Sequence, residues 1–242
     1  LIYVVVLDID GNHSVKVVSY DGEWRVVRSI ALDYEPIRVY IDRDRARLII
    51  LDYEGGVGVY DLETYEQRFF RKLDSIGFFG MIDTIVANRD RSAYYTSVVS
   101  QNFLLLDAET FDTLFVRRLG VPTIGLDYDP ETNQVYAAAT LTRSILVLDG
   151  DTLDLKKRIK TGTTVRELYI DRSRKLIIVA GYTDGLISFY DLRTHGLRAR
   201  VFIGKLARTI HIEQRSGRVF ASSSCGLYEV LVDRLLAEGV RE

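Results

Sequence analysis

The sequence contains little cysteine, which cross-links a chain, and little proline, which interrupts regular secondary structure. One cysteine, Cys225, among 242 residues excludes an intramolecular disulfide framework and a zinc site built from several cysteines. Only three prolines and no Ser/Gly-rich tract are present, which argues against a linker or a disordered tail. With 32 basic against 34 acidic residues the net charge is -2, so no overall field attracts nucleic acid or anionic lipid.

Long apolar runs and catalytic motifs are also missing. The run LIYVVVL at the start is far shorter than the ~20 residues of a membrane helix, and its β-branched residues suit a buried strand. There is no GxSxG, no GxxxxGK[ST] and no GxGxxG following a strand, so the common nucleophile and phosphate-binding signatures are absent. A single globular domain is therefore the default expectation.

What the sequence does contain is a repeated phrase. DGLISFYDLRT at Asp184–Thr194 has counterparts in GGVGVYDLET at Gly55–Thr64, NFLLLDAET at Asn102–Thr110 and SILVLDGDT at Ser144–Thr152. The aspartates that close these phrases are separated by steps of 40, 46, 42 and 42 residues, and they are Asp21, Asp61, Asp107, Asp149 and Asp191, with a sixth step at Val232 or Asp233. A second series has the same spacing: Asp42, Asn88, Asp129, Asp171 and Glu213.

Each period contains four short β-runs. In the best-defined unit they are Val165–Asp171, Lys175–Gly181, Leu186–Leu192 and Leu197–Ile203. Such a sheet cannot bury both faces alone and must stack on its neighbours, which predicts an all-β propeller of four-stranded antiparallel blades. The units run over 1–32, 33–73, 74–119, 120–160, 161–203 and 204–242. Six blades are expected, the first and last incomplete, with seven as the alternative.

Two stretches resemble known propeller repeats. DPETNQVYAAATLTRSILVLDGDTLDLKKRI at Asp129–Ile159 is similar to the repeat of the YVTN family, and YTDGLISFYDLRTHG at Tyr182–Gly196 resembles a WD40 hairpin with tyrosine in place of tryptophan. The GH dipeptide of WD40 units is absent, which favours the YVTN family. The resemblance implies a scaffold with diverse partners, and it favours an extracytoplasmic location. The sequence does not begin with methionine, so the compartment and an upstream segment stay open.

In a propeller, the loops that join the second strand to the third, and the fourth strand to the next sheet, share one end of the blades. We call this the loop end. There the loop DSIGFFGM at Asp74–Met81 is longer than its counterparts and apolar, and it either plugs the central channel or forms a docking patch. The candidate partner-binding residues at this end are Ile76, Phe78, Phe79, Met81, Tyr34, Leu141, Tyr182 and Leu206. A protein partner is the expectation.

Basic residues gather on the fourth, outer strands. The basic rim comprises Arg68, Arg71, Lys72, Arg117, Arg118, Lys156, Lys157, Arg158, Lys160, Arg198 and Arg200. Such residues protect exposed edge strands from pairing with other chains. The alternative is a belt that binds nucleic acid or an anionic surface.

A lactonase-like hydrolase with an axial metal is the remaining alternative, because enzymatic propellers gather acids or histidines at the axis. The three histidines, His13, His195 and His211, fall in different parts of the repeat and do not converge. No catalytic residue, metal ligand or cofactor is therefore assigned, and a non-catalytic scaffold is the favoured function.

Overall fold

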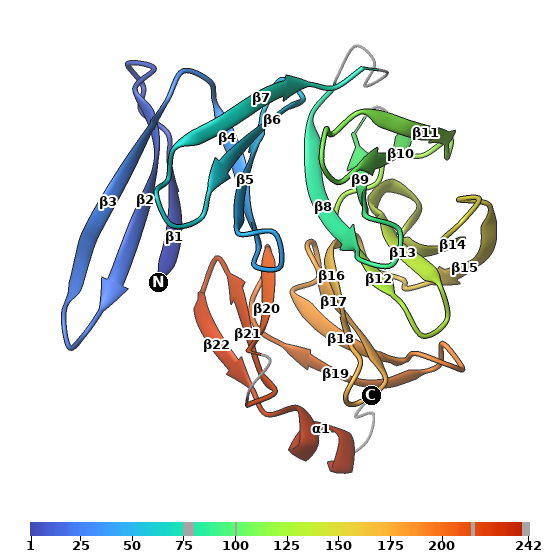
Figure 1. Cartoon of the computed structure of the whole chain (residues 1–242). Helices are drawn as coiled ribbons and strands as arrows, with labels where there is room; N and C mark the ends of the chain where they lie inside the picture. The colour runs from blue at the N-terminus through green and yellow to red at the C-terminus, as the bar shows by residue number, and fades with distance from the viewer. Residues whose placement is uncertain (75–79, 100, 214–215, 239–242) are drawn as a thin grey trace. The chain divides into compact units, whose positions relative to one another are not determined.

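The computed structural model describes residues 1–74, 80–99, 101–213 and 216–238. These residues fall into two compact units, Leu1–Arg118 and Leu119–Glu242. Each unit contains three antiparallel sheets whose strands follow one another in sequence order (Figure 1). That the two units form a single domain stays a prediction.

The first unit contains one three-stranded and two four-stranded sheets. The first sheet has β1 (Ile2–Val6), β2 (His13–Tyr20) and β3 (Trp24–Leu32). The second has β4 (Pro36–Asp42), β5 (Arg47–Asp52), β6 (Gly56–Asp61) and β7 (Gln67–Lys72). The third has β8 (Ile82–Asn88), β9 (Ala93–Val98), β10 (Asn102–Asp107) and β11 (Thr113–Arg118).

The second unit contains two four-stranded sheets and a final three-stranded one. The fourth sheet has β12 (Leu126–Asp129), β13 (Gln134–Ala139) and, after the 3₁₀ turn η1 (Thr140–Thr142), β14 (Ser144–Asp149) and β15 (Leu155–Lys160). The fifth has β16 (Val165–Asp171), β17 (Leu176–Gly181), β18 (Leu186–Asp191) and β19 (Leu197–Phe202). The sixth has β20 (Thr209–Glu213), β21 (Arg218–Ser223) and β22 (Gly226–Val230), followed by helix α1 (Val232–Glu238).

The predicted strands agree with the observed ones to within a residue in the fifth sheet, and the first and last sheets are incomplete as expected. One element is not anticipated by the sequence pattern: helix α1 forms after the last strand. No helix in the described part of the chain has the length and hydrophobicity needed to cross a membrane.

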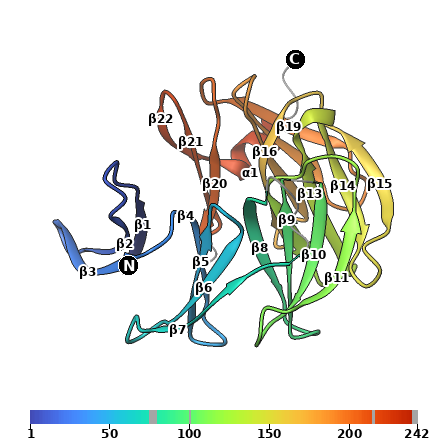
Figure 2. The same ribbon diagram turned by 90° about the horizontal axis from the view of Figure 1, so that it is seen from above.

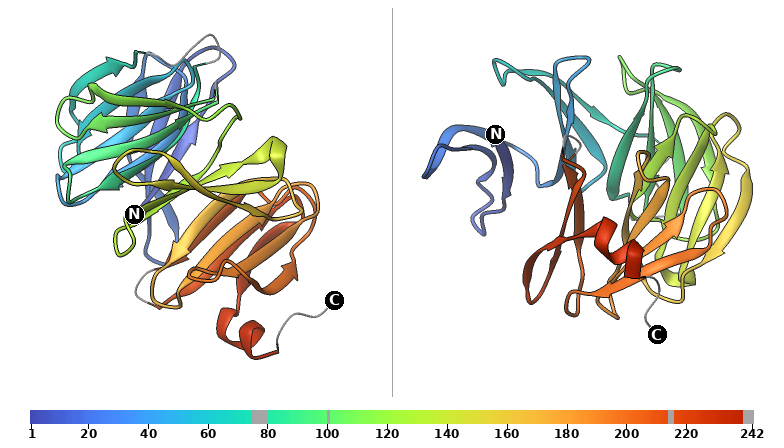
Figure 3. Two further views of the ribbon diagram at one scale, coloured as in Figure 1. Left: turned by 90° about the vertical axis from the view of Figure 1, so that its right-hand side faces the viewer. Right: turned by 90° about the horizontal axis from the view of Figure 1, so that it is seen from below.

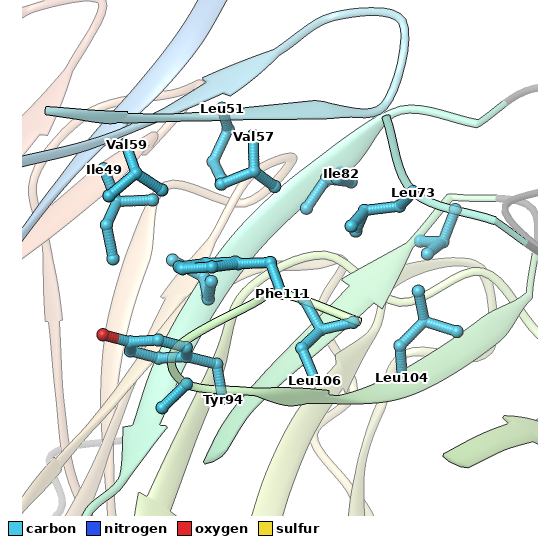
Figure 4. Close-up of a cluster of buried hydrophobic side chains, with 13 residues drawn as sticks. Ile49, Leu51, Val57, Val59, Leu73, Ile82, Tyr94, Leu104, Leu106 and Phe111 are labelled. Carbon is cyan, nitrogen blue, oxygen red and sulfur yellow. The ribbon is translucent and has the colours of Figure 1, made fainter. Parts of the chain in front are cut away.

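Burial follows the position of a strand in its sheet. The second strands β5, β9 and β17 are buried along their whole length, which suits strands that are covered on both faces. The outer strands β7 and β11 are largely exposed. Apolar side chains from facing sheets fill the space between them, and Figure 4 shows Ile49, Val57 and Val59 of the second sheet opposite Tyr94 and Leu106 of the third.

The turn between the third and fourth strands explains the first series of aspartates. Asp107 Oδ1 accepts hydrogen bonds from the amides of Glu109 and Thr110, both at 2.8 Å, and Thr110 Oγ1 accepts one from the amide of Asp112 at 3.2 Å. Phe111 then takes a left-handed φ of 59°. The same side-chain bonds recur at Asp61, Asp149 and Asp191. The repeated phrase is therefore a turn signal, an Asx-turn followed by one residue with positive φ.

These hydrogen bonds favour the charged carboxylate. The pKa of Asp107 and of Asp191 is lowered mainly by a backbone amide donor. For Asp61 and Asp149 the largest cause is a basic side chain on the following strand, Arg68 or Lys156, which also lowers the pKa. A turn of this kind is consequently held by charge as well as by geometry.

The second series has the corresponding role between the first and second strands. Asp42 Oδ1 accepts the amides of Asp44 and Arg45 at 3.2 and 3.3 Å, and Ala46 has a φ of 49°. Asp171 binds the amide of Arg174 in the same way, at 3.1 Å. Both predicted series thus mark turns.

The sixth step of the first series was misplaced. Ile177 pairs with Tyr190 just before Asp191, and the corresponding pair in the sixth sheet is Val219 with Val230. Leu231, not Val232 or Asp233, therefore holds the place of the aspartate. Because leucine offers no acceptor for the turn amides, the usual turn does not form, and the chain enters α1 instead of a fourth strand.

Candidate functional site

In the second unit the loops of the loop end are joined to one another by hydrogen bonds. Thr161 donates to the carbonyl of Arg143 from both its amide and its hydroxyl, at 3.0 and 2.9 Å. Thr140 Oγ1 donates to the carbonyl of Val165 at 2.8 Å. These bonds connect the fourth sheet to the start of the fifth and make the loops a fixed surface.

Similar contacts join the loops of the fifth sheet to those of the sixth. The amide of Tyr182 donates to the carbonyl of Thr164 at 2.8 Å, and the guanidinium of Arg208 lies 5.9 Å from the centre of the Tyr182 ring, within the range of a cation–π contact. Ser224 Oγ donates to the carbonyl of Lys205 at 2.8 Å. Tyr182 is therefore a supporting residue of this surface.

One close approach in this region requires glycine. Gly185 has a φ of 71°, and a Cβ built there would lie 2.3 Å from the carbonyl oxygen of Gly204. Two loops can cross at that distance only without a side chain. The loop 203–208 is thereby pressed against the turn that precedes β18.

Two predicted apolar residues project from these fixed loops. Leu141, in η1, is 76% exposed, and Leu206 is 37% exposed. Arg143 closes η1 in the left-handed conformation. Both leucines lie at the loop end, so each presents exposed apolar area there.

The loop end of the second unit is also basic. Arg143, Lys205 and Arg208 are exposed, and none of the three forms an ion pair within the described residues. The acid in these loops is Asp184, which accepts the amide of Leu186 at 3.2 Å. Sequence reasoning missed this property because it grouped the basic residues by strand; sorting the loop residues by end of the blade would have found it.

The corresponding loops of the first unit carry the opposite charge. Their exposed acids are Asp10, Asp33, Glu35, Glu54 and Asp74. Lys72, at the end of β7, pairs with Glu54 at 3.2 Å and with Asp52 at 3.6 Å. Each unit therefore offers a loop end of one predominant sign.

Of the predicted partner-binding residues of the first unit, Tyr34 and Met81 lie within the described residues, and both are partly buried. Tyr34 packs on Phe70 with ring centroids 4.9 Å apart and shares a hydrogen bond of 3.0 Å with the hydroxyl of Tyr60. Burial, together with that bond, raises the pKa of Tyr34. Met81 is half-buried beside β8. The remaining predicted residues, Ile76, Phe78 and Phe79, lie outside the described residues.

Much of the basic rim is paired with acids. In three sheets the basic residue seven positions after the turn aspartate reaches back to it: Arg68 to Asp61 at 2.6 Å, Lys156 to Asp149 at 2.7 Å and Arg198 to Asp191 at 3.3 Å. Arg71 pairs with Asp112, and Arg158 donates to the hydroxyls of Thr142 and Ser144. The other rim residues, Arg117, Arg118, Lys157, Lys160 and Arg200, lie on the same outer strands. This pairing favours edge protection over an anion-binding belt.

The opposite end of the blades carries ion pairs between neighbouring sheets. Arg45 bonds Asp42 at 3.1 Å and reaches Glu109 of the next sheet at 3.3 Å. Arg174 repeats this arrangement, with Asp171 at 2.9 Å and Asp233 of α1 at 2.7 Å. Mixed charges at this end pair with one another, as the sequence pattern predicts.

Within the described ranges, no group of three His, Cys, Asp or Glu side chains is placed to hold a metal ion. His13 begins β2, His195 lies in a turn after β18, and His211 lies in β20. Two acids that sequence reasoning missed, the partly buried Asp127 and the buried Glu167, have a structural role. Asp127 accepts the amide of Ile170 at 2.8 Å, and Glu167 accepts that of Ile210 at 3.0 Å, so each joins the first strand of its own sheet to that of the next.

Burial raises the pKa of Asp127, against the opposing influence of that amide and of Arg172. A carboxyl in this position is committed to backbone contacts, and its perturbed pKa follows from a structural role.

Comparison with known proteins bears on the fold. No protein-family model matches the sequence, and no curated protein matches it. Among solved structures, a chain in a crystal structure of the mitotic checkpoint complex is similar with a TM-score of 0.68 and 16% identity, over 91% of this chain and 71% of that one. The β-propeller domain of Cps50 (Swd1) from Myceliophteria thermophila is similar with a TM-score of 0.65 and 16% identity, over 78% of this chain and 62% of that one.

The chain has a six-bladed β-propeller fold. The six sheets are its blades, with the first strand of each complete blade on the inside and the fourth on the rim. The coarser part of the resemblance, to propeller repeats, is confirmed. The preference for the YVTN family over WD40 repeats gains no support, since no family model matches.

Proposed function

We propose that this propeller is a non-catalytic scaffold that docks a protein partner on its loop end, through the loops that join second to third strands and fourth strands to the next blade. The single observation that carries the proposal is the loop end of the second unit, where exposed Leu141 and Leu206 stand on loops fixed by hydrogen bonds. Fixed loops lose little conformational freedom on binding, so exposed apolar area there contributes directly to affinity.

The positive charge at the loop end of the second unit indicates what kind of partner would bind there. Arg143, Lys205 and Arg208 lie in the same loops as the two leucines, and none of the three forms an ion pair within the described residues. A partner with acidic residues flanking an apolar anchor is therefore complementary to this surface, and its association rate should fall with added salt. The chain of similar fold in the mitotic checkpoint complex is part of an assembly, which supports a scaffold role here.

The test is capture of partners by the tagged protein from its source cells, with quantitative mass spectrometry. The variant Leu141→Ser with Leu206→Asn removes the apolar anchors, and asparagine tolerates the left-handed φ of position 206. The matched control is Leu155→Ser, which removes an exposed leucine from the rim strand β15.

We expect the loop variant to lose the captured partner at least tenfold while the rim control keeps it. A second pair, Lys205→Glu against Lys157→Glu, tests the charge in the same way. Equal capture by loop and rim variants, with both proteins folded, would refute docking at the loop end.

A further inference from the structure

The outer edges of the blades differ in one respect. The rim strands β3, β7, β11, β15 and β19 each carry at least two Lys or Arg residues, which keeps other chains from pairing with an exposed edge. The outer strand of the sixth blade is β22, with the sequence GLYEV and no basic residue. It is the third strand of its sheet, and among the described residues no fourth strand is paired with it (Figure 2).

The cause of this open edge is the leucine at position 231. In blades two to five the turn aspartate directs the chain back along the third strand, but after β22 the chain enters α1. Val232 is buried in the core between the fifth and sixth blades, and Arg174 holds Asp233 with two hydrogen bonds of 2.7 and 3.0 Å. Helix α1 is thus fixed toward the fifth blade, near β19 (Figure 3). Within the described residues of the second unit, no strand pairs with the outer edge of β22.

The surroundings of the edge are mostly apolar, with Glu229 and Arg234 as the charged residues of the groove beside it. Leu227 is 73% exposed and Leu231 is 59% exposed. A shallow groove of about 250 Å³ runs beside the strand, and its lining includes Val201 of β19, Tyr228 and Val230 of β22, and Leu235 of α1. Side chains of an added strand that point toward the fifth blade would enter this groove, because alternate residues of a strand face the same side.

We propose that β22 is a second docking site, which binds an extended segment of a partner protein as the missing fourth strand, antiparallel to β22. Backbone hydrogen bonds would supply the affinity, and an apolar side chain opposite Tyr228, placed in the groove, would supply specificity. The four complete blades show the length of the occupant, since each of their fourth strands has six residues. This site does not depend on the loop end.

Size distinguishes this occupant from a second copy of the chain. Two five-residue edges paired with each other bury far less than the roughly 800 Å² per partner of a stable dimer. An extended segment needs only one strand and one pocket. Glu229, the one charged residue of β22, is already paired with Arg218 at 2.7 Å, so it does not protect the edge as an unpaired charge would.

The chain itself provides a probe. Leu197–Ile203, LRARVFI, is a natural fourth strand in which Arg200 lies opposite Ser188, the residue equivalent to Tyr228. A fluorescent peptide LRALVFI therefore places an apolar side chain opposite Tyr228, and the same peptide with proline at its third position cannot complete the backbone ladder. We expect saturable binding of the first peptide by fluorescence polarisation and at least tenfold weaker binding of the second. The variant Leu227→Lys, which places a charge at the edge, should weaken binding at least tenfold, whereas Leu155→Lys on β15 should leave it unchanged.

Hydrogen exchange separates the possible occupants. In the free protein alternate amides of β22 should exchange quickly, and the peptide should slow them at least tenfold. Protection of all β22 amides before the peptide is added would show that the chain's own residues fill the edge. A dimer in light scattering that the peptide dissociates would show that a second copy fills it. Either result would overturn the proposal, and so would equal binding of the proline peptide. The variant Leu141→Ser with Leu206→Asn should bind the peptide normally. The experiment therefore tests docking at β22 independently of docking at the loop end.

Discussion

The left-handed residue of the repeated turn provides a quantitative test at Phe111. This side chain is fully buried and stacks on Tyr94 at 5.1 Å (Figure 4). It also meets Phe69 edge-on at 5.9 Å. Replacing it with alanine should cost about 3–5 kcal/mol, the usual range for a buried phenylalanine. The φ of 59° adds a second effect, because a residue with a Cβ is strained there by roughly 1–2 kcal/mol and glycine is not.

Alanine and glycine can therefore be compared at the same site. Elsewhere alanine is favoured over glycine by roughly 0.5–1 kcal/mol of chain entropy, plus about 0.8 kcal/mol for a buried methyl group. At position 111 relief of strain offsets most of this advantage, so Phe111→Gly should be within about 1 kcal/mol of Phe111→Ala. Leu104 is fully buried in the strand β10. There the free energy of unfolding of Leu104→Ala should exceed that of Leu104→Gly by about 1–2 kcal/mol.

Urea unfolding followed by circular dichroism measures all four variants. The expected result is an Ala–Gly difference that is clearly smaller at position 111 than at position 104. If the alanine variant is more stable than the glycine variant by the same amount at both sites, the left-handed turn is not the structure that the repeated aspartates specify.

Three further predictions concern single contacts. Gly58→Ala places a Cβ 2.1 Å from the hydroxyl of Tyr34, so it should destabilise by about 1–3 kcal/mol; an unchanged melting temperature would contradict the packing of Tyr34. Burial, aided by Lys157, lowers the pKa of His195 below 6.5, so the unfolded state binds the proton more readily and the wild type should lose stability as pH falls below about 6.5. His195→Leu should remove that loss in urea midpoints measured at about pH 7.5 and 5, and an equal loss in both proteins would contradict it. Arg174→Ala should speed amide exchange in α1 several-fold by releasing Asp233, and unchanged exchange would show that apolar contacts alone hold the helix.

Much of the fold was accessible from sequence because its signals are local. An aspartate followed by threonine three residues later, and then by a left-handed residue, specifies a turn within a few positions, so the repeat of Asp61, Asp107, Asp149 and Asp191 located four blades. The pairing of Arg68 with Asp61 follows from the same short range, since both residues belong to one hairpin.

Other features were not accessible because they depend on contacts between blades. Asp127 and Glu167 look like ordinary strand acids until the amides of Ile170 and Ile210 are placed beside them. The structure of the last unit depends on one position, Leu231. Leucine there has no side-chain acceptor for the turn amides, and a helix forms in place of the fourth strand. The two phenylalanines of the loop at Asp74–Met81 lie outside the described residues, so their role in docking stays a prediction.

Cross-linking of a captured partner to lysine tests the central claim most directly, because the lysines mark different parts of the propeller. Lys205 stands at the loop end beside Leu206, Lys156 and Lys157 lie on the rim strand β15, and Lys175 lies in the turn at the opposite end. The proposed docking predicts that the partner cross-links to Lys205 and that Leu141→Ser with Leu206→Asn abolishes the cross-link. Cross-links confined to Lys175, or to Lys156 and Lys157, would contradict it.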